Sequence, residues 1–319
     1  MIIGLDIGYG FTKVFCMTAD GLKNQFIFKT LVSSYTPKNN FGDPVGIVYV
    51  NDNPFVVGHE AEKHLIGEFK VTQDFVGTPE YFAILAYAIK LSRSVPDMIV
   101  LGLPPGIYSK EKAEVLIQKF YRQQFKDHNN LHIPIPKQVK YIPQGAGIYF
   151  AHYFEEDRSL SEKNTVVIDI GYRTLDVVLF AKDKKDEKYG YKSEAATSYP
   201  LGVKNLYDQV KNAFSKIHGT FINDEIVDKI ITEGIFHHFG EDYVFDASEI
   251  VKNFYVEQVV RIIKDYADKT KNLGYNVEKV LVGGGGVVYA KEIKGTTIVK
   301  DPQFANARGY AFYGKYSNR

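Results

Sequence analysis

The sequence contains one pattern twice, at its start and near its middle. Residues 2–13 read IIGLDIGYGFTK, and residues 165–176 read TVVIDIGYRTLD. In each copy an apolar run reaches an aspartate, Asp6 or Asp169, and two residues later a glycine opens a turn into a second run. The apolar run predicts a buried strand, and the turn predicts a second strand that returns alongside it. The repetition indicates an internal duplication, so we expect two related halves.

In each half a third strand is expected after the repeated pattern. Residues 24–31 follow an Asp-Gly turn, and residues 189–198 follow a charged hairpin tip. Each half would then begin with three antiparallel strands before its helices. The first copy alone also fits an ordinary hairpin. Two related α/β domains, however, would place both acidic turns at a cleft between them.

Glycines stand where the predicted turns are sharpest. Gly8 and Gly10 bracket the first turn, and Gly171 opens the second. Glycine adopts positive φ without strain and lets backbone N–H groups approach an anion, so both turns are candidate phosphate sites. Four further glycines, 283–286, follow an apolar strand. Bare backbone there suits close approach of a flat ligand or of another chain segment, and a flexible turn is the alternative.

Short strands and amphipathic helices are expected over the rest of the chain. Two stretches, 33–77 and 218–245, depart from this pattern, and we interpret each as a small inserted subdomain. Thr78 is expected to cap a helix that begins at Pro79, and Asp301 with Pro302 is expected to cap the last helix. The remaining predicted strands are 47–50, 55–57, 98–103, 139–142, 280–282 and 297–299, and the predicted helices are 78–93, 109–126, 148–154, 203–217, 250–274 and 303–313.

Composition limits the partners and the compartment. Of 319 residues, 39 are basic and 38 acidic, which leaves a formal charge of +1 and no long-range steering toward nucleic acid. The single cysteine, Cys16, cannot form an intramolecular disulfide, and His218, His237 and His238 have no Cys or carboxylate partner at metal-ligand spacing. A signal-peptide pattern and a run of about 18 apolar residues are both missing. We therefore expect a cytoplasmic protein with no membrane contact and no direct contact with nucleic acid.

Taken together, the motifs resemble those of the actin, sugar-kinase and heat-shock-chaperone ATPase superfamily, in which two ribonuclease-H-like domains clamp a nucleotide. In that superfamily the first turn is a phosphate loop, matched here by residues 6–13. A connecting segment is matched by residues 143–147, the second phosphate loop by residues 169–176, and the adenosine motif by residues 282–287. The resemblance covers nearly the whole chain and implies an α/β, actin-like fold around a nucleotide cleft.

Within the superfamily, the chain looks most like ParM/StbA-type actin-like proteins, including archaeal members. The shared features are its short length, the PQGAG connecting segment, the DIGYRTLD second loop and the terminal QFANARGY at 303–310. One departure is that Tyr172 and Arg173 stand where many members have glycine, which narrows the second loop. The resemblance implies domain I at 1–153 plus 305–319, with the insertion at 33–77, and domain II at 154–304, with the insertion at 218–245.

The resemblance also implies roles for individual residues. Asp6 and Asp169 would hold Mg²⁺ largely through water, because Mg²⁺ keeps several waters in its octahedral shell. Gln144 would orient the attacking water, and Asp176 would either polarise that water or anchor its own loop. The nucleotide contacts would come from Gly8, Tyr9, Gly10, Phe11, Thr12 and Lys13 in the first loop, from Gly171, Tyr172, Arg173 and Thr174 in the second, from Gly202 at a helix start, and from Gly283, Gly284, Gly285, Gly286 and Val287.

The function implied by this resemblance is an ATPase that polymerises with ATP and Mg²⁺. Such proteins serve as cytoskeletal filaments, and plasmid-borne members push DNA apart through a DNA-binding adaptor protein. The two insertions are the natural contact surfaces between copies. Two alternatives stay open: a soluble kinase or phosphatase on the same fold, and a nucleotide-binding scaffold that does not polymerise. The sequence also leaves open whether GTP substitutes for ATP.

Overall fold

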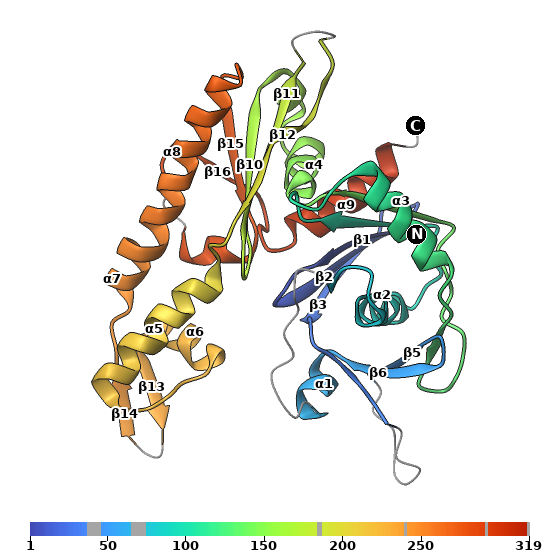
Figure 1. Ribbon diagram of the computed structural model, residues 1–319, viewed down its shortest axis with the longest axis horizontal. Coiled ribbons are helices and arrows are strands. Elements are labelled where there is room, and N and C mark those ends of the chain that lie inside the picture. Colours follow the sequence, from blue (N-terminus) through green and yellow to red (C-terminus); the bar gives the residue numbers. More distant parts are fainter. Residues whose placement is uncertain (37–45, 65–74, 184–186, 239–240, 291–292, 318–319) are drawn as a thin grey trace. The chain divides into compact units, whose positions relative to one another are not determined.

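The computed structural model describes residues 1–36, 46–64, 75–183, 187–238, 241–290 and 293–317. The chain forms two compact units (Figure 1). Unit 1 comprises Met1–Arg158 and Phe304–Arg319, and unit 2 comprises Ser159–Gln303. Each unit is described below by itself.

Unit 1 contains a five-stranded sheet in the order β3-β2-β1-β7-β9. Its first three strands form the expected antiparallel meander, while β7 and β9 run parallel to β1. The carboxyl ends of β1, β7 and β9 therefore meet at one edge of the sheet. The strands are β1 (Ile2–Ile7), β2 (Phe11–Met17), β3 (Lys23–Lys29), β7 (Met98–Leu103) and β9 (Gln138–Pro143).

Unit 2 contains a second five-stranded sheet, β12-β11-β10-β15-β16, with the same sequence of directions. This shared topology confirms the prediction of two related α/β halves, each opening with a three-stranded meander. The strands are β10 (Thr165–Ile170), β11 (Leu175–Lys182), β12 (Tyr189–Tyr199), β15 (Lys279–Gly283) and β16 (Thr297–Ile298).

A second, smaller sheet in unit 1 packs against α2 (Pro79–Leu91). Its order is β4-β6-β5-β8, from β4 (Val32–Ser34), β5 (Ile47–Val50), β6 (Asn53–Val57) and β8 (Phe125–Asp127). Figure 1 shows α2 between this sheet and the larger one. The apolar side chains of α2 join those of β1 and β5 in one core. Thr78 caps α2 as predicted, accepting a hydrogen bond from the Tyr81 amide at 3.3 Å.

The helix predicted over 109–126 was too long. The helix, α3 (Lys110–Tyr121), ends five residues earlier, and Phe125–Asp127 forms β8 against β5. The reason is a non-local contact: the Gln124 amide donates to the side-chain oxygen of Asn51 at 2.9 Å, and Phe125 is buried. The small sheet thus includes a strand from outside the stretch 33–77.

The predicted cap of the last helix was also wrong. Helix α9 (Ala305–Tyr316) begins after Phe304, and no side chain caps it. The Pro302 carbonyl instead accepts a hydrogen bond from the Gly284 amide at 2.8 Å. This segment therefore supports the turn that contains glycines 283–286, which we call the glycine-rich turn. The other helices of unit 1 are α1 (His59–His64) and α4 (Ala146–Glu155), and a 3₁₀ turn (Arg158–Glu162) leads into unit 2.

Unit 2 has ordered structure within the weakly patterned stretch 218–245. Helix α6 (Asp224–Glu233) is capped by Asn223, and it is followed by the hairpin of β13 (Ile235–His238) and β14 (Glu241–Val244). His218 packs against the rings of Phe214 and Tyr243. The long predicted helix is present as α7 (Ser248–Ile250), a π-helical segment (Val251–Val256) and α8 (Glu257–Asn272), and α5 (Val203–His218) precedes α6.

None of the helices in the described ranges has the length and apolar character needed to cross a bilayer.

Helix α9 packs closely on both α4 and β1 because glycines remove side chains at the contacts. A Cβ on Gly309 would lie 1.7 Å from the Gly147 carbonyl oxygen, and a Cβ on Gly4 would lie 1.8 Å from the Ala307 carbonyl oxygen. Neither distance is possible between real atoms, so the helix would have to move. These contacts fix α9 over the sheet that carries Asp6.

We predict that Gly309→Ala destabilises the protein by about 1–3 kcal/mol, as expected for overpacking. Within a helix this substitution would otherwise stabilise by up to about 1 kcal/mol, so the sign separates packing from propensity. Urea unfolding followed by circular dichroism measures the change. Gly106→Ala is the control, because a Cβ there would have no atom within 4 Å. Equal stability of the two variants would contradict the packing argument.

Candidate functional site

The first turn joins β1 to β2 and is held by its own backbone. The Gly8 amide donates to the Phe11 carbonyl at 3.2 Å, and the amide of Thr30, which directly follows β3, donates to the Gly10 carbonyl at 3.0 Å. The buried hydroxyls of Thr12 and Thr30 lie 2.9 Å apart. One predicted phosphate-binding amide, that of Gly8, is therefore used within the turn, and Thr12 packs inward beneath it.

Three predicted site residues of unit 1 come together at the end of β1. The Asp6 carboxylate is 4% exposed, and it accepts hydrogen bonds from the Lys13 ammonium at 3.1 Å and from the Gln144 side-chain amide at 3.4 Å. Lys13 stands directly opposite Asp6 on β2, and Gln144 follows β9 at the edge where the parallel strands end. The unit thus places a cation and an amide in contact with one acid.

The backbone of Gln144 is held by further contacts, besides the bond that its side chain makes to Asp6. The backbone amide of Gln144 donates to the Leu103 carbonyl at 2.6 Å. The next residue, Gly145, has a φ of 86°, which a residue with a side chain adopts only with strain. The Gly145 amide donates to the Asn306 side-chain oxygen at 3.1 Å. Asn306 is buried on α9, and sequence reasoning assigned it no role although it lies within the quoted QFANARGY segment.

The second turn carries two buried acids. Asp169 is 4% exposed and Asp176 is 2% exposed, and the two residues are direct neighbours across β10 and β11. Directly opposite residues of an antiparallel pair project from the same face of the sheet, so the carboxylates share one face. The Gly171 amide donates to the Thr174 carbonyl at 2.8 Å and closes the turn.

The glycine-rich turn packs directly on the second turn. Gly284 has a φ of 92°, and a Cβ there would lie 2.4 Å from Asp169 Oδ1. A Cβ on Gly286 would lie 2.5 Å from the Tyr255 hydroxyl, whereas one on Gly285 would meet no atom within 4 Å. The structure therefore shows the close approach of another chain segment for Gly284 and Gly286 and leaves open space beside Gly285.

Tyr255 is a residue that sequence reasoning missed. It lies in the π-helical segment, it is fully buried, and burial together with the charge of Asp169 raises the pKa of its hydroxyl. The hydroxyl therefore stays protonated, and it has no hydrogen-bond partner among the described residues. A π-helical segment is common at functional sites, but a single sequence carries no signal for one.

Gly202, predicted to contact ligand, packs on the second turn instead. A Cβ there would lie 2.5 Å from the Tyr172 carbonyl oxygen. The first amides of α5, those of Val203 and Lys204, donate to the carbonyls of Gly171 and Tyr172 at 3.1 and 2.8 Å. In this structure the start of α5 thus holds the second turn, and a contact of Gly202 with ligand stays a prediction.

Among the described residues, no group of three or more His, Cys, Asp or Glu side chains is arranged to hold a metal ion. The two acidic turns each offer one or two carboxylates instead. That donor set suits Mg²⁺, which takes oxygen ligands and retains waters, better than a metal that requires an all-protein cage.

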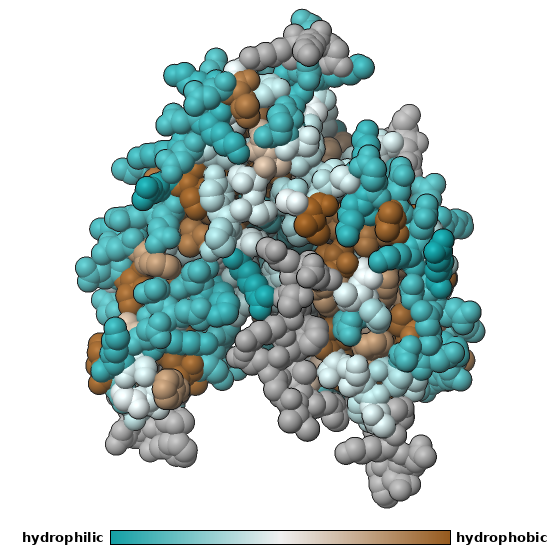
Figure 2. Space-filling view, in the orientation of Figure 1, coloured by the Kyte–Doolittle hydropathy of each residue, from teal (hydrophilic) through white to brown (hydrophobic). Residues whose placement is uncertain are grey.

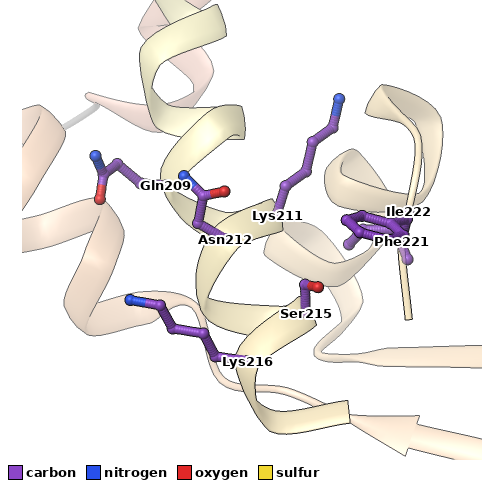
Figure 3. A pocket seen from close by; sticks show the side chains of 7 residues that line it. All are labelled: Gln209, Lys211, Asn212, Ser215, Lys216, Phe221 and Ile222. Atoms are coloured by element: carbon purple, nitrogen blue, oxygen red, sulfur yellow. The ribbon is translucent and has the colours of Figure 1, made fainter. Parts of the chain in front are cut away.

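A separate hollow of about 500 Å³ lies on unit 2 (Figure 3). Its lining comes from α5 and from the segment that follows it, and it contains no predicted site residue. The lining residues are Gln209, Lys211, Asn212, Ser215, Lys216, Phe221 and Ile222.

Comparison with known families assigns both halves of the chain. A model of the N-terminal domain of actin-like proteins matches residues 4–147, and a model of the C-terminal domain of archaeal MreB-like actin homologues matches residues 167–294. The chain therefore belongs to the actin-like proteins, as the sequence motifs indicated. No curated protein matches the sequence significantly.

Solved structures of actin-like proteins share the fold over almost the whole chain. A 15-stranded ParM filament from Clostridium botulinum is 25% identical with a TM-score of 0.70, and a non-polymerisable quadruple mutant of pCBH ParM is 23% identical with a TM-score of 0.73; the match covers 98% of each chain in both cases. The archaeal actin homologue Ta0583 is 20% identical with a TM-score of 0.74 over 99% of each chain. The same homologue has been solved in complex with ADP.

We predict that Lys13→Met destabilises unit 1 by about 3 kcal/mol, because it leaves the Asp6 carboxylate buried without its cation. The matched control is Lys29→Met, whose partner Glu62 is exposed, and there we expect a change below about 1 kcal/mol. Chemical denaturation of both variants gives the comparison. Combining Lys13→Met with Asp6→Asn should recover part of the loss, and a Lys13 variant as stable as the Lys29 variant would contradict the pairing.

Proposed function

We propose that this protein is an actin-like ATPase that hydrolyses ATP with Mg²⁺ and assembles into filaments. The contact of Asp6 with Lys13 and Gln144 carries the proposal, since it joins a cation for phosphate, an acid for a hydrated metal and an amide for a water. Membership of the actin-like proteins supports it. The proposed domains are those expected from the sequence, 1–153 with 305–319 and 154–304, and each supplies one turn.

The chemistry requires position and charge more than covalent participation. Phosphoryl transfer passes through a loose transition state, so electrostatic stabilisation and alignment of the attacking water dominate. Lys13 would neutralise phosphate oxygens, and backbone amides of the first and second turns would bind them. Asp6 and Asp169 would hold hydrated Mg²⁺, which would supply positive charge to offset that of the phosphate oxygens.

Gln144 has the role of orienting the attacking water. Its backbone is fixed by Leu103 and by the Gly145 contact to Asn306, so the side chain starts from one defined position. In the structure the side-chain amide donates to Asp6. If Asp6 took part in holding hydrated Mg²⁺, the Gln144 amide would be available to orient a water instead.

We predict that Gln144→Ala keeps ATP binding within about threefold of the unchanged protein but slows phosphate release by about 100-fold, a typical loss when a positioned proton-transfer or water-orienting group is removed. A fluorescent ATP analogue measures affinity, and a phosphate sensor measures turnover. The conservative control is Gln144→Asn. Turnover at the normal rate in a pure Gln144→Ala preparation would remove Gln144 from the mechanism.

Exposed apolar side chains on unit 2 support self-association as the route to filaments. Ile217 at the end of α5 is 69% exposed, Phe221 before α6 is 93% exposed, and Val244 at the end of β14 is 67% exposed, so all three lie within or beside the stretch 218–245. Figure 2 shows apolar patches over this hairpin, set among hydrophilic side chains. A head-to-tail contact between this surface and a different surface of the next copy generates a filament when the rotation between copies does not close a ring.

We predict that the protein forms sedimentable polymer with ATP and Mg²⁺ and that Phe221→Ser raises the concentration needed for assembly at least about tenfold, because it removes a fully exposed aromatic from the contact. Leu22→Ser is the control, since Leu22 is 68% exposed on unit 1 outside both predicted insertions. Light scattering and sedimentation provide the measurements. The absence of polymer from the unchanged protein over a wide concentration range would contradict filament formation.

Two other functions remain as alternatives on the same fold. A kinase or phosphatase would transfer phosphate to or from an acceptor, and a product assay that separates free phosphate from a phosphorylated acceptor distinguishes it. A scaffold would bind nucleotide without forming polymer.

In the leading proposal the protein works in the cytoplasm, its principal partner is itself, and a DNA-binding adaptor would link a filament to plasmid segregation. Competition between ATP and GTP for the site would define nucleotide preference.

A further inference from the structure

A row of three tyrosine rings crosses unit 2 between the two turns that carry the predicted nucleotide contacts. Tyr172 belongs to the second turn, Tyr207 to α5, and Tyr289 to the end of the 3₁₀ turn (Gly285–Tyr289) that contains the last glycines. The ring centres of Tyr172 and Tyr207 are 6.4 Å apart, and those of Tyr207 and Tyr289 are 6.1 Å apart, both edge to face. The hydroxyls of Tyr207 and Tyr289 are 2.8 Å apart.

Two aspartates of α6 accept hydrogen bonds from both ends of this row. Asp224 accepts from the Tyr172 hydroxyl, and Asp228 accepts from the Tyr207 hydroxyl at 3.2 Å and from the Tyr289 hydroxyl. The aspartates are four residues apart, which places them on one face of the helix. We call these five residues the tyrosine–aspartate cluster.

The protonation states suit these bonds. Burial would raise the pKa of Asp224, but hydrogen bonds from Lys211 and Tyr172 outweigh it, so the pKa of Asp224 lies below its usual value. Burial and the neighbouring carboxylates raise the pKa of all three tyrosine hydroxyls. Neutral phenols therefore donate to charged carboxylates, and such bonds are stronger than those between neutral groups.

We propose that Asp224 and Asp228 are positioning residues that hold the second turn and the glycine-rich turn in fixed positions relative to α6. The connection to nucleotide rests on the proposed function. Backbone contacts hold each turn to its immediate neighbours, and the bonds to α6 link the two turns to each other. Holding both turns in place beforehand reduces the ordering cost of ligand binding. It also makes α6, which lies inside the stretch 218–245, respond to the state of both turns.

The first test needs no nucleotide. Hydrogen exchange with mass spectrometry is compared for the unchanged protein, Asp228→Asn and Tyr289→Phe. Asp228 lies in segment 224–233 and Tyr289 lies in segment 283–290, so each substitution changes only one segment. We expect either substitution to accelerate exchange about tenfold in both segments, because losing a hydrogen bond to a charged group raises the equilibrium constant for local opening about tenfold or more. Glu225→Gln is the control, because Glu225 is an exposed residue of the same helix that pairs only weakly with Lys229 at 3.9 Å. Faster exchange confined to the segment that carries the substitution would overturn the proposal.

The second test measures ADP affinity of the same variants by calorimetry. We expect Asp228→Asn and Tyr289→Phe to bind ADP about three- to tenfold more weakly and Glu225→Gln to bind normally, in proportion to the lost ordering. Unchanged affinity in the first two variants would overturn the positioning role. If the unchanged protein binds no nucleotide, the proposed function fails, whereas the cluster is still judged by the exchange experiment.

Discussion

Close approach of bare backbone is the constraint on which this structure depends. In unit 1, α9 reaches α4 and β1 only because Gly147, Gly309 and Gly4 carry no side chain. In unit 2, Gly284 does the same for the glycine-rich turn, which lies against Asp169. Both predicted acidic residues therefore sit on strands whose position is fixed by a neighbouring segment at contact distance. Such packing resists small displacements, because interiors at this density have no free volume to absorb them.

The sequence predicted those parts of the fold whose signal is local. The apolar runs before Asp6 and Asp169 give strands, and Thr78 with Pro79 gives a helix start that the structure contains. The family resemblance assigned Asp6 and Gln144, 138 residues apart, to one site, which no periodicity indicates, and the structure brings the two side chains into contact.

Parts that depend on distant partners were not predictable in the same way. Phe125–Asp127 continues an amphipathic helix pattern, and only its pairing with β5 makes it a strand. Asn306 supports Gly145 across 161 residues, and Tyr255 reaches the glycine-rich turn from a π-helical segment. A single sequence states none of these pairings, because each side chain alone fits an ordinary helix. Their signals would lie in pairs of positions rather than in single ones.

The two turns differ in charge at equivalent positions, and this difference bears on the part that each would take in the proposed nucleotide binding. Asp6 stands opposite Lys13 in the first pair of strands, whereas Asp169 stands opposite Asp176 in the second. The negative charge of Asp6 is thus already offset by the positive charge of Lys13 in the same hairpin. Two carboxylates side by side repel each other and offer a hard cation two sets of oxygens on one face. In the proposed mechanism Lys13 would serve phosphate at the first turn, while Asp176 would add a second carboxylate beside Asp169, which together with Asp6 is proposed to hold hydrated Mg²⁺.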